Sequence, residues 1–536
     1  MGNQYDTLEK DRLDTQACLD SKKTQLERNK LGQFSTPTIL ARDMLNHAYS
    51  LLPKHQKVSF LDPAIGTGAF YSALQNIFPD NRIRAAVGYE IDRHYAEPAI
   101  ELWNDTKLNI HIADFTTQPP QKRFDLVICN PPYVRHHHIP STDKARLQIR
   151  SHLASGHQLG GLAGLYCHFM LQANMWMNDG AIAGWLIPSE FMDVNYGIAA
   201  KHYLLETVTL LQIHRFDPND VQFADALVSS AVVWIQNTPP PKGHRVRFTF
   251  GGSLSQPRID RTVPVSILGS EHKWTRFPKN KARNQPDGPV IGDLFKIRRG
   301  IATGGNKHFI LTDTEIHRRQ LPMQFFKPIL PSPRYLTNDI VLAGQDGAPN
   351  LDQRLFLLDI PLTESEIKKE HSSLWAYLQE IKSEGIHERY LCRHRSPWYS
   401  QEKRPTAPIV CTYMGRGDTK SKRPFRFILN ESNATVANVY LAMYATPTLQ
   451  TIIDADPDII RVIWSELNAL KPEDLLCEGR VYGGGLHKLE PKELAKVAVP
   501  NLAQYISNST KNESCLFDHC AAVEVQNHPF AHALTH

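Results

Sequence analysis

The stretch DLVICNPPYVRHHH, from Asp125 to His138, contains residues that could act on a nitrogen atom. An apolar run that reads as a buried strand is followed directly by Asn130, Pro131, Pro132 and Tyr133. The two prolines fix their own φ angles and lack an N–H, so they end the strand in a stiff loop. The side-chain carbonyl of Asn130 and the backbone carbonyl of Pro131 are two adjacent acceptors, and Tyr133 adds a ring for stacking.

Such a loop suits methylation of an amine or amide nitrogen. The lone pair of an exocyclic aromatic amine is delocalised into its ring, which makes the amine a poor nucleophile. Two acceptors that take both N–H hydrogens draw the nitrogen toward tetrahedral geometry and localise that lone pair. Because prolines hold the acceptors, little reorganisation is needed during the reaction. We therefore expect Asn130, Pro131, Pro132 and Tyr133 to be catalytic.

Carboxylates follow three further strand-like runs, at 58–61, 83–89 and 108–112. Ligands of open parallel sheets bind outside the carboxyl ends of the strands. An acid at one strand end is often only a helix N-cap, but repetition at three successive ends favours a ligand site. The candidates for this one site are Asp62, Pro63, Ala64, Gly66, Gly68, Glu90, Ile91, Asp114 and Phe115.

The chemistry of these residues indicates a cationic ligand that contains adenosine. Gly66 and Gly68 allow close backbone approach, but Tyr71 stands where the dinucleotide fingerprint has its third glycine. Asp62 disfavours a pyrophosphate there and suits a sulfonium or ammonium group. Glu90, 22 residues after Gly68, has the separation at which an acid takes ribose hydroxyls. Asp114, after the third run, can accept a hydrogen bond from an adenine amine, and Phe115 can cover the adenine ring. S-adenosyl-L-methionine combines all these groups.

The order of these motifs resembles the gamma-class adenine-N6-specific DNA methyltransferases of restriction–modification systems. The motifs that carry the resemblance are GQFSTP, LDPAIGTGAF, VGYEID, IADF and ICNPPY, all within about residues 30–240. The resemblance implies that Phe34, Thr36 and Pro37 contact the methionine end of S-adenosyl-L-methionine, the expected cofactor. We also expect Asn130 to touch the cofactor. A looser likeness at 297–311 and 482–491 resembles that family's target-recognition domain.

An adenine inside duplex DNA could reach this loop only after being flipped out, at a cost of a few kcal/mol. The resemblance implies a second aromatic residue on the other face of the flipped base, and Phe223 is the candidate. His136, His137 and His138 cannot all face one metal from a strand, so we expect a DNA-facing loop and no metal site. The polar segment 141–164 is expected to be a loop that orders on DNA.

The fold expected is α/β, a Rossmann-like S-adenosylmethionine methyltransferase domain with a mostly parallel sheet, plus a second α+β target-recognition domain. A helix with one apolar face is expected over 162–177, with Gly180 as its stop. Two runs at 208–214 and 229–235 would complete the sheet, as an antiparallel edge. The expected boundaries are 1–30 for an N-terminal helical extension, 31–240 for the methyltransferase domain, 241–285 for a connector, 286–500 for the target-recognition domain and 501–536 for a tail.

Composition agrees with a multi-domain globular protein, since 41% of the 536 residues are apolar and 21% are charged. We expect a cytoplasmic protein with reduced cysteines, because no long apolar run and no signal peptide is present. The net charge is +5, yet the window 391–426 alone carries nine Lys/Arg and two acids. Aromatic residues are interleaved there, which suits a nucleic-acid surface, although a solvated basic face would have the same composition.

Other functions stay open from the residues alone. Asn-Pro-Pro-Tyr also occurs in enzymes that methylate a protein glutamine amide, and related sites act on RNA. About 400 residues follow Tyr133, which favours a DNA-reading domain. Enzymes that methylate cytosine usually carry Ser where this chain has Asn130. A non-catalytic DNA-recognition subunit would not need the intact motifs. We expect double-stranded DNA as partner, a monomer, no fused nuclease and, from the resemblance, a separate cognate restriction endonuclease.

Overall fold

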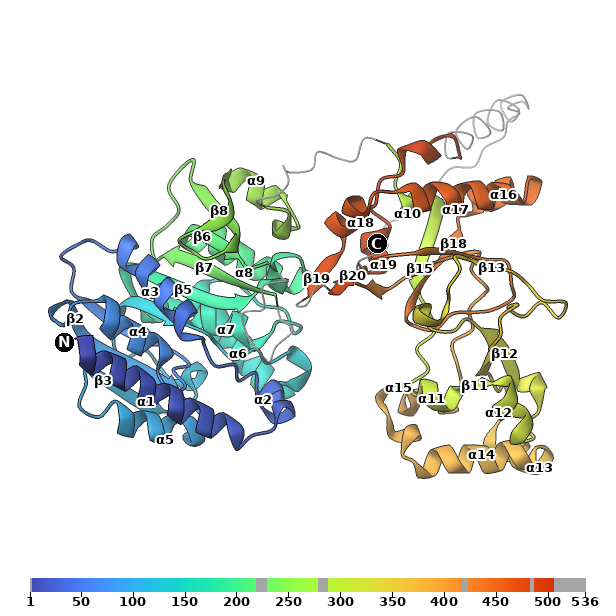
Figure 1. Ribbon diagram of the computed structural model, residues 1–536, viewed down its shortest axis with the longest axis horizontal. Helices are drawn as coiled ribbons and strands as arrows, with labels where there is room; N and C mark the ends of the chain where they lie inside the picture. Colours follow the sequence, from blue (N-terminus) through green and yellow to red (C-terminus); the bar gives the residue numbers. More distant parts are fainter. Residues whose placement is uncertain (1, 218–228, 278–287, 417–422, 483–485, 506–536) are drawn as a thin grey trace, which may run out of the picture. The chain divides into compact units, whose positions relative to one another are not determined.

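The chain folds into two units in the computed structural model, which describes residues 2–217, 229–277, 288–416, 423–482 and 486–505. The first unit extends to residue 284, and the second takes in 285–480 and the chain from 486 on. In Figure 1 the first unit is coloured blue to green and the second yellow to red. Among the described residues, no helix has the length and apolar character needed to cross a membrane.

A mixed sheet forms the centre of the first unit. Its nine strands, counted over the described residues, lie in the order β3-β2-β1-β4-β5-β7-β6-β8-β9. The neighbours from β3 to β5 all pair in parallel. The strand order reverses at β1, between β2 and β4, which is where ligands of open α/β sheets bind. The bounds are β1 (Val58–Asp62), β2 (Ile83–Glu90), β3 (Leu108–Ile112), β4 (Phe124–Cys129), β5 (Met177–Pro188), β6 (Thr209–Arg215), β7 (Ser230–Gln236), β8 (Arg245–Gly252) and β9 (Pro257–Pro264).

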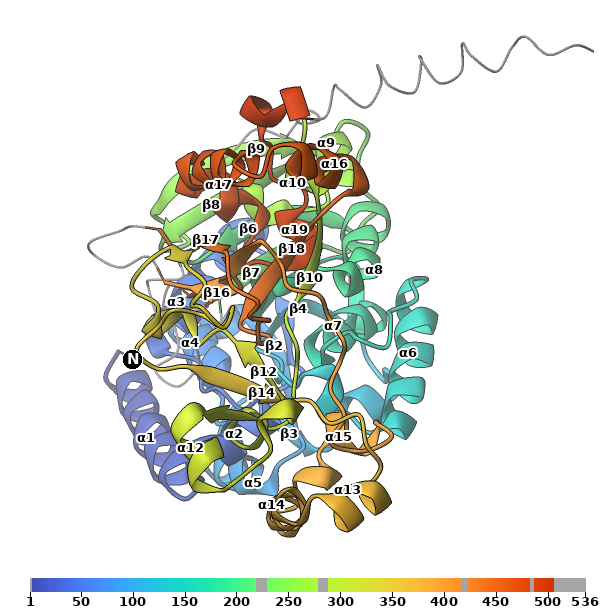
Figure 2. The same cartoon turned by 90° about the vertical axis from the view of Figure 1, so that its right-hand side faces the viewer.

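Helices cover both faces of this sheet, which explains why β1 and β4 are buried at every position. Figure 2 shows α3 and α4 on one side of the strands and α6 and α7 on the other. The helices of this unit are α1 (Gly2–Ser21), α2 (Gln25–Leu31), α3 (Thr38–Leu51), α4 (Ala69–Ile77), α5 (Arg93–Leu102), α6 (Ser141–Ser155), α7 (Leu165–Gln172), α8 (Ile198–His202) and α9 (Val265–Ser270).

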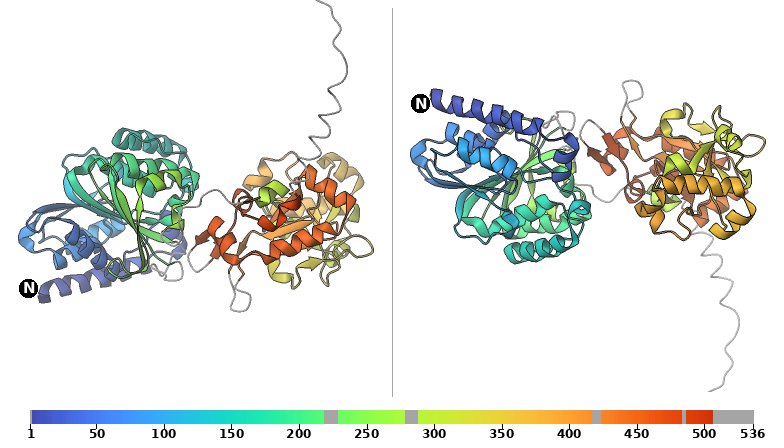
Figure 3. Two further views of the ribbon diagram at one scale, coloured as in Figure 1. Left: turned by 90° about the horizontal axis from the view of Figure 1, so that it is seen from above. Right: turned by 90° about the horizontal axis from the view of Figure 1, so that it is seen from below.

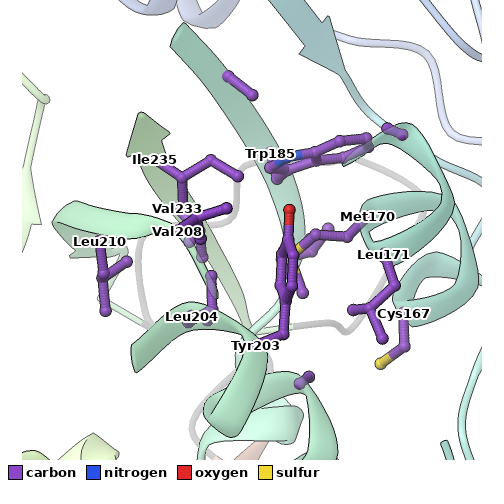
Figure 4. Close-up of a cluster of buried hydrophobic side chains, with 14 of the residues drawn as sticks. Cys167, Met170, Leu171, Trp185, Tyr203, Leu204, Val208, Leu210, Val233 and Ile235 are labelled. Atoms are coloured by element: carbon purple, nitrogen blue, oxygen red, sulfur yellow. The ribbon is translucent and has the colours of Figure 1, made fainter. Parts of the chain in front are cut away.

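Each face of the sheet has its own hydrophobic core. Figure 4 shows part of one core, in which the ring of Tyr203 lies beside Met170 and Leu171 of α7 and faces strand residues that include Val233. The Tyr203 hydroxyl donates to Oδ1 of Asn174 at 3.0 Å, so the polar tip of this buried ring keeps a partner. The covered sheet is therefore a rigid base for the loops at its strand ends.

The four strands predicted ahead of the Asn-Pro-Pro-Tyr loop are present, each within one residue of the expected bounds. The predicted helix over 162–177 is shorter, because α7 gives way to a 3₁₀ turn at Ala173–Trp176 and β5 starts at Met177. Gly180 is not the stop of that helix. It lies within β5 at φ 78°, since the chain already pairs with β4 at Met177.

Three other expectations about the first unit differ from the structure. The strands β6 and β7 are not an edge, because β8 pairs in parallel with β6 and β9 pairs with β8. Residues 245–252 and 257–264, within the expected connector, instead form β8 and β9, and the buried side chains Val246 and Phe248 hold β8 in the sheet. The polar segment 141–164 is no loop over its first part. It forms α6, whose buried Leu147, Ser151 and Ala154 share one helix face.

The second unit is α+β, as expected, with small sheets instead of one large sheet. Five strands lie in the order β10-β18-β15-β17-β13, three in the order β11-β14-β12, and β16 pairs with β20. The strands are β10 (Phe295–Arg299), β11 (Ile310–Thr312), β12 (Phe326–Ile329), β13 (Ile340–Val341), β14 (Leu355–Leu358), β15 (Ile409–Thr412), β16 (Met414–Gly415), β17 (Phe427–Asn430), β18 (Tyr440–Ala445), β19 (Arg480–Tyr482) and β20 (Leu486–Lys488). The helices are α10 (Ile291–Leu294), α11 (Asn306–Phe309), α12 (Asp313–Arg318), α13 (Glu364–Glu370), α14 (Ser372–Ser383), α15 (Tyr390–Arg393), α16 (Pro447–Ala455), α17 (Ile459–Ala469), α18 (Pro472–Glu478) and α19 (Pro491–Leu494).

The aromatic residues of the basic window do not form a nucleic-acid surface. Tyr399, Tyr413 and Phe425 are buried in hydrophobic cores of the second unit, and Trp398 is half-buried. Two arginines of the window are also structural. Arg395 donates to the carbonyls of Ala302 and Thr303, at 2.6 and 3.0 Å, and Arg426 donates to Asp339 at 2.7 Å. Arg416 and Arg423 remain exposed on the unit's surface.

Candidate active site

A pocket of about 680 Å³ opens at the carboxyl ends of the parallel strands, at the reversal of strand order. This volume suits a ligand the size of a nucleoside with an amino-acid tail. Ten of the predicted site residues line the pocket, namely Phe34, Pro63, Ala64, Gly66, Glu90, Ile91, Asp114, Phe115, Asn130 and Pro132. Six others are close in the chain to lining residues but are not part of the lining, namely Thr36, Pro37, Asp62, Gly68, Pro131 and Tyr133. Phe223 lies outside the described residues.

The turn between β1 and α4 needs its two glycines for different reasons. Gly66 has φ 53° and Gly68 has φ 92°, both in the left-handed region that favours glycine. A Cβ on Gly68 would lie 2.5 Å from Nε1 of Trp103, whereas one on Gly66 would meet no atom within 4 Å. The backbone at Gly66 can therefore approach a ligand closely, and Gly68 lets α4 pack.

Glu90 joins two loops of the pocket. One of its carboxylate oxygens accepts from the Gly66 amide at 3.1 Å, and the other accepts from the Asp92 amide at 2.9 Å. Burial raises the pKa of Glu90, although these amide hydrogen bonds oppose the shift. The predicted ribose-binding acid thus lines the pocket in a fixed orientation, and lone pairs remain on both oxygens for a donor.

Asp62 occupies a different place from the one expected. Its side chain is 1% exposed, lies behind the pocket wall and accepts from the Ala64 amide at 3.1 Å. Burial raises the pKa of Asp62 to about 8, against the effect of that amide, and the charge of Glu90 adds to the rise. The hydrogen bond from the Ala64 amide lets Asp62 hold the turn that follows β1.

The acid and aromatic pair after β3 forms one end of the pocket. Asp114 caps the 3₁₀ turn Phe115–Thr117 by accepting from the Thr116 amide at 2.8 Å, as the N-cap interpretation predicted. Its second oxygen lies 3.4 Å from a guanidinium nitrogen of Arg146. Phe115 is held by its neighbours, with ring centroids 5.5 Å from Phe169 and 5.1 Å from Trp176. Asp114 therefore combines a capping role with a place on the pocket wall.

The side-chain amide of Asn130 is oriented by the loop that precedes α3. Its nitrogen donates to the carbonyl of Phe34 at 3.0 Å and to the hydroxyl of Thr36 at 3.1 Å. Its oxygen, Oδ1, is buried and has no hydrogen-bond partner within the described part of the chain. Both donors are used and the acceptor is left, which is the arrangement that an incoming N–H group needs. Thr36 thus acts behind the wall through Asn130.

Tyr133 does not present its ring to the pocket. The side chain is buried, its hydroxyl donates to the carbonyl of Leu186 at 3.1 Å, and its ring centroid lies 5.5 Å from that of Phe34. Its amide donates to the carbonyl of Gly32 at 3.1 Å, and a Cβ on Gly32 would collide with the Tyr133 backbone. The expected stacking of a base on Tyr133 is absent from this arrangement, in which the ring packs the two loops together.

Several pocket residues were not predicted from the sequence. Gln16 and Asp20 come from α1, Arg146 comes from α6, and Phe169 comes from α7. No motif marks them, and only the contacts between distant segments bring them to the strand ends. With them, the lining holds five carboxylates (Asp20, Glu90, Asp92, Asp114 and Asp143) and one guanidinium, that of Arg146. Such an acid-rich lining disfavours a pyrophosphate and fits a ligand with hydroxyl, amine and cationic groups.

Fold and site together define an S-adenosylmethionine-dependent methyltransferase. The structure of the Type IIL restriction–modification enzyme MmeI in complex with DNA has the same fold, with a TM-score of 0.52 at 14% sequence identity. That likeness covers 81% of this chain and 66% of the other. S-adenosyl-L-methionine is the cofactor expected of this class, and the donor set of the pocket fits it.

Sequence comparison finds similar proteins among restriction–modification methylases. The model of the Eco57I restriction–modification methylase matches residues 72–222, and that of the C-terminal domain of the Type II methyltransferase M.Eco57I matches residues 278–527. The chain is 28% identical to the Type II methyltransferase M.XamI of Xanthomonas campestris pv. amaranthicola, over 88% of this chain and 86% of that protein. It is also 28% identical to M.AccI of Acinetobacter calcoaceticus, over 89% and 86%. The chain is therefore similar to the Eco57I restriction–modification methylases over both of these stretches.

Proposed function

We propose that this chain methylates the exocyclic N6 amine of an adenine that has been flipped out of duplex DNA. Similarity to restriction–modification methylases supports methyl transfer to DNA, and the proposal specifies the base and the atom. The observation that carries the proposal is the buried Oδ1 of Asn130, an acceptor without a partner in the described chain at the wall of the pocket.

The residues of the loop act on the amine by hydrogen bonding. Oδ1 of Asn130 accepts one N–H of the amine, and the backbone carbonyl of Pro131 accepts the other. The lone pair of the nitrogen is thereby localised, and the hydrogen bonds from Asn130 to Phe34 and Thr36 prevent its amide from rotating. The bound cofactor supplies the electrophilic methyl group. The proton leaves the nitrogen after transfer, so no strong base is required at the site.

Two further parts of the proposal concern DNA. A flipped adenine loses stacking worth a few kcal/mol, which a pocket contact has to offset in part. Phe223 remains our candidate for an aromatic contact to the base, because Tyr133 is held within the wall. A separate endonuclease that cuts the same site is a further part of the proposal and rests on the resemblance. A monomeric state is also proposed.

The test is transfer of tritium from methyl-labelled S-adenosylmethionine to duplex DNA, followed by digestion and separation of nucleosides. The expected product is N6-methyladenine. S-adenosylhomocysteine added in excess should suppress the label, which controls for cofactor-independent incorporation. Label in N4-methylcytosine would contradict the choice of base, and label only in RNA or protein would contradict DNA as the substrate. Sequencing of methylated DNA would then identify the recognition sequence.

A further inference from the structure

The first helix of the chain forms a wall of the pocket. Helix α1 lies along the outside of the first unit, beside the helices that follow β1 and β2, as Figure 3 shows. It is anchored there by buried polar contacts, in which Glu9 accepts from Arg12 at 2.7 Å and from Ser72 of α4 at 2.6 Å. Gln16 and Asp20, near the end of α1, line the pocket. The predicted N-terminal extension is thus part of the binding site.

Gln16 connects this helix to the glycine turn. The hydroxyl of Thr67, between the two glycines, donates to Oε1 of Gln16 at 2.6 Å and accepts from Arg12 at 3.3 Å. Nε2 of Gln16 then donates to Oδ1 of Asp20 at 2.9 Å. Because the preceding residue of the turn, Gly66, donates its amide to Glu90, a short chain of contacts links Asp20 to the acid at the end of β2.

The carboxylate of Asp20 has one occupied oxygen and one that is less engaged. Oδ1 accepts from Gln16 and also from the hydroxyl of Tyr95 at 2.9 Å. Oδ2 lies 3.6 Å from a guanidinium nitrogen of Arg28, which is beyond hydrogen-bonding distance. The two contacts on Oδ1 fix the orientation of the carboxylate, while Oδ2, which is ion-paired with Arg28, retains acceptor capacity.

We infer that Asp20 accepts a hydrogen bond from a ribose hydroxyl of the bound cofactor, and that Gln16 is a positioning residue for it. This inference rests on the proposed use of S-adenosylmethionine. A ribose offers two neighbouring hydroxyl donors, and both oxygens of Glu90 already accept a backbone amide. A second carboxylate, linked to Glu90 through the glycine turn, provides an acceptor for the second donor. Cofactor binding should therefore depend on α1, which contributes Gln16 and Asp20.

The experiment measures binding of S-adenosylhomocysteine, without DNA, to the full-length protein by calorimetry. Asp20→Asn keeps an acceptor for Gln16 and Tyr95 but removes the charge, and we expect binding about tenfold weaker. Asp14→Asn makes the same change of charge at an exposed position of the same helix and should bind as the wild type does. Thermal unfolding of both variants checks folding, and Asp20→Ser replaces Asp20→Asn if that variant is unfolded.

The 2′-deoxy and 3′-deoxy analogues of S-adenosylhomocysteine locate the contact. In the wild type, loss of the contacted hydroxyl weakens binding, and in Asp20→Asn the same loss should have a smaller effect. Equal binding of Asp20→Asn and the wild type would overturn the inference, as would an equal loss for all three ligands, which indicates an indirect effect. A wild type that binds none of the ligands would instead contradict the proposed function.

Discussion

Asn130 shows how a single residue depends on a distant segment for its chemistry. Its motif provides an amide at the end of β4, but an amide can rotate to present either its oxygen or its nitrogen. The carbonyl of Phe34 and the hydroxyl of Thr36, almost 100 residues earlier, take both N–H donors. The oxygen is therefore the group that remains for a substrate amine, and the activity should respond to both segments.

Removal of the Asn130 acceptor should abolish transfer while the cofactor still binds. For Asn130→Ala we expect kcat to fall by at least about 10²-fold, because one pre-oriented hydrogen bond to the reacting group is lost. Single-turnover transfer to DNA and calorimetric binding of S-adenosylhomocysteine measure the two effects separately. Thr36→Val should lower kcat by about tenfold through a freed amide, and Thr36→Ser should restore it. Full turnover by Asn130→Ala would refute this mechanism.

Asp62 should make the stability of the free protein depend on pH. Its pKa is raised from the ordinary value of 3.8 to about 8, so the folded state binds one proton more than the unfolded state between these values. Its contribution to stability is present below about pH 4 and is lost as the pH rises through 8. In urea denaturation, Asp62→Asn should be more stable than the wild type at pH 8, with a difference that shrinks toward pH 5. A constant difference would show that Asp62 does not titrate in this range.

At the scale of secondary-structure elements, the glycine turn positions the pocket by letting α4 and α5 pack. Trp103, which follows α5, donates its indole N–H to the Thr67 carbonyl at 2.9 Å and stands against Gly68. The turn is therefore held from behind by α5 and from the side by α1. The conformation of the turn therefore depends on the packing of α1, α4 and α5, and the motif alone does not determine it.

The two glycines of this turn should differ in their tolerance of alanine. Gly68→Ala places a methyl group 2.5 Å from the Trp103 ring at a positive φ, and we expect a loss of about 2–4 kcal/mol in the free energy of unfolding. Gly66→Ala has the same backbone strain but open space, so about 1 kcal/mol is expected. Chemical denaturation of both variants makes the comparison. Equal losses in the free energy of unfolding would mean that backbone strain alone causes the destabilisation and that contact with Trp103 adds nothing.

Viewed as a whole molecule, the chain combines a methyltransferase unit with a second unit whose cores contain most of the aromatic residues of the basic window. Because those rings are buried, the aromatic and the basic residues of the window have different roles. The rings and two of the arginines stabilise the second unit, and the exposed basic residues are left as candidates for contact with DNA phosphates. This unit remains our proposal for target recognition.

Reversal of charge at Arg416 and Arg423 should weaken DNA binding and reduce its dependence on salt. Each lost phosphate contact lowers the slope of log K against log salt concentration by about one, so Arg416→Glu with Arg423→Glu should lower it by up to about two. Fluorescence anisotropy with duplex DNA at several salt concentrations measures the slope. Lys368→Glu with Lys369→Glu on α13 is the matched control. An unchanged slope would place the window away from DNA.

The sequence by itself determined which chemical groups gather at the ends of the central strands. Continuous apolar runs predict buried parallel strands, and parallel strands bring their carboxyl ends to one edge of the sheet. Glu90, Asp114 and Asn130 could therefore be assigned to one site from their positions in the chain. The order of local motifs also indicated the resemblance to restriction–modification methylases. These inferences succeeded because each depends on a period or a motif within a few residues.

Only the tertiary structure decided which side chains face the ligand. Asp62 and Tyr133 belong to the motifs but are buried behind the wall, whereas Asp20 belongs to none and lines the pocket. The aromatic residues of the basic window became core, and the expected connector became two strands of the sheet. In each case, contacts between segments far apart in the chain decide whether a side chain is buried or lines the pocket. Local spacing cannot predict this, because burial depends on packing against a distant partner.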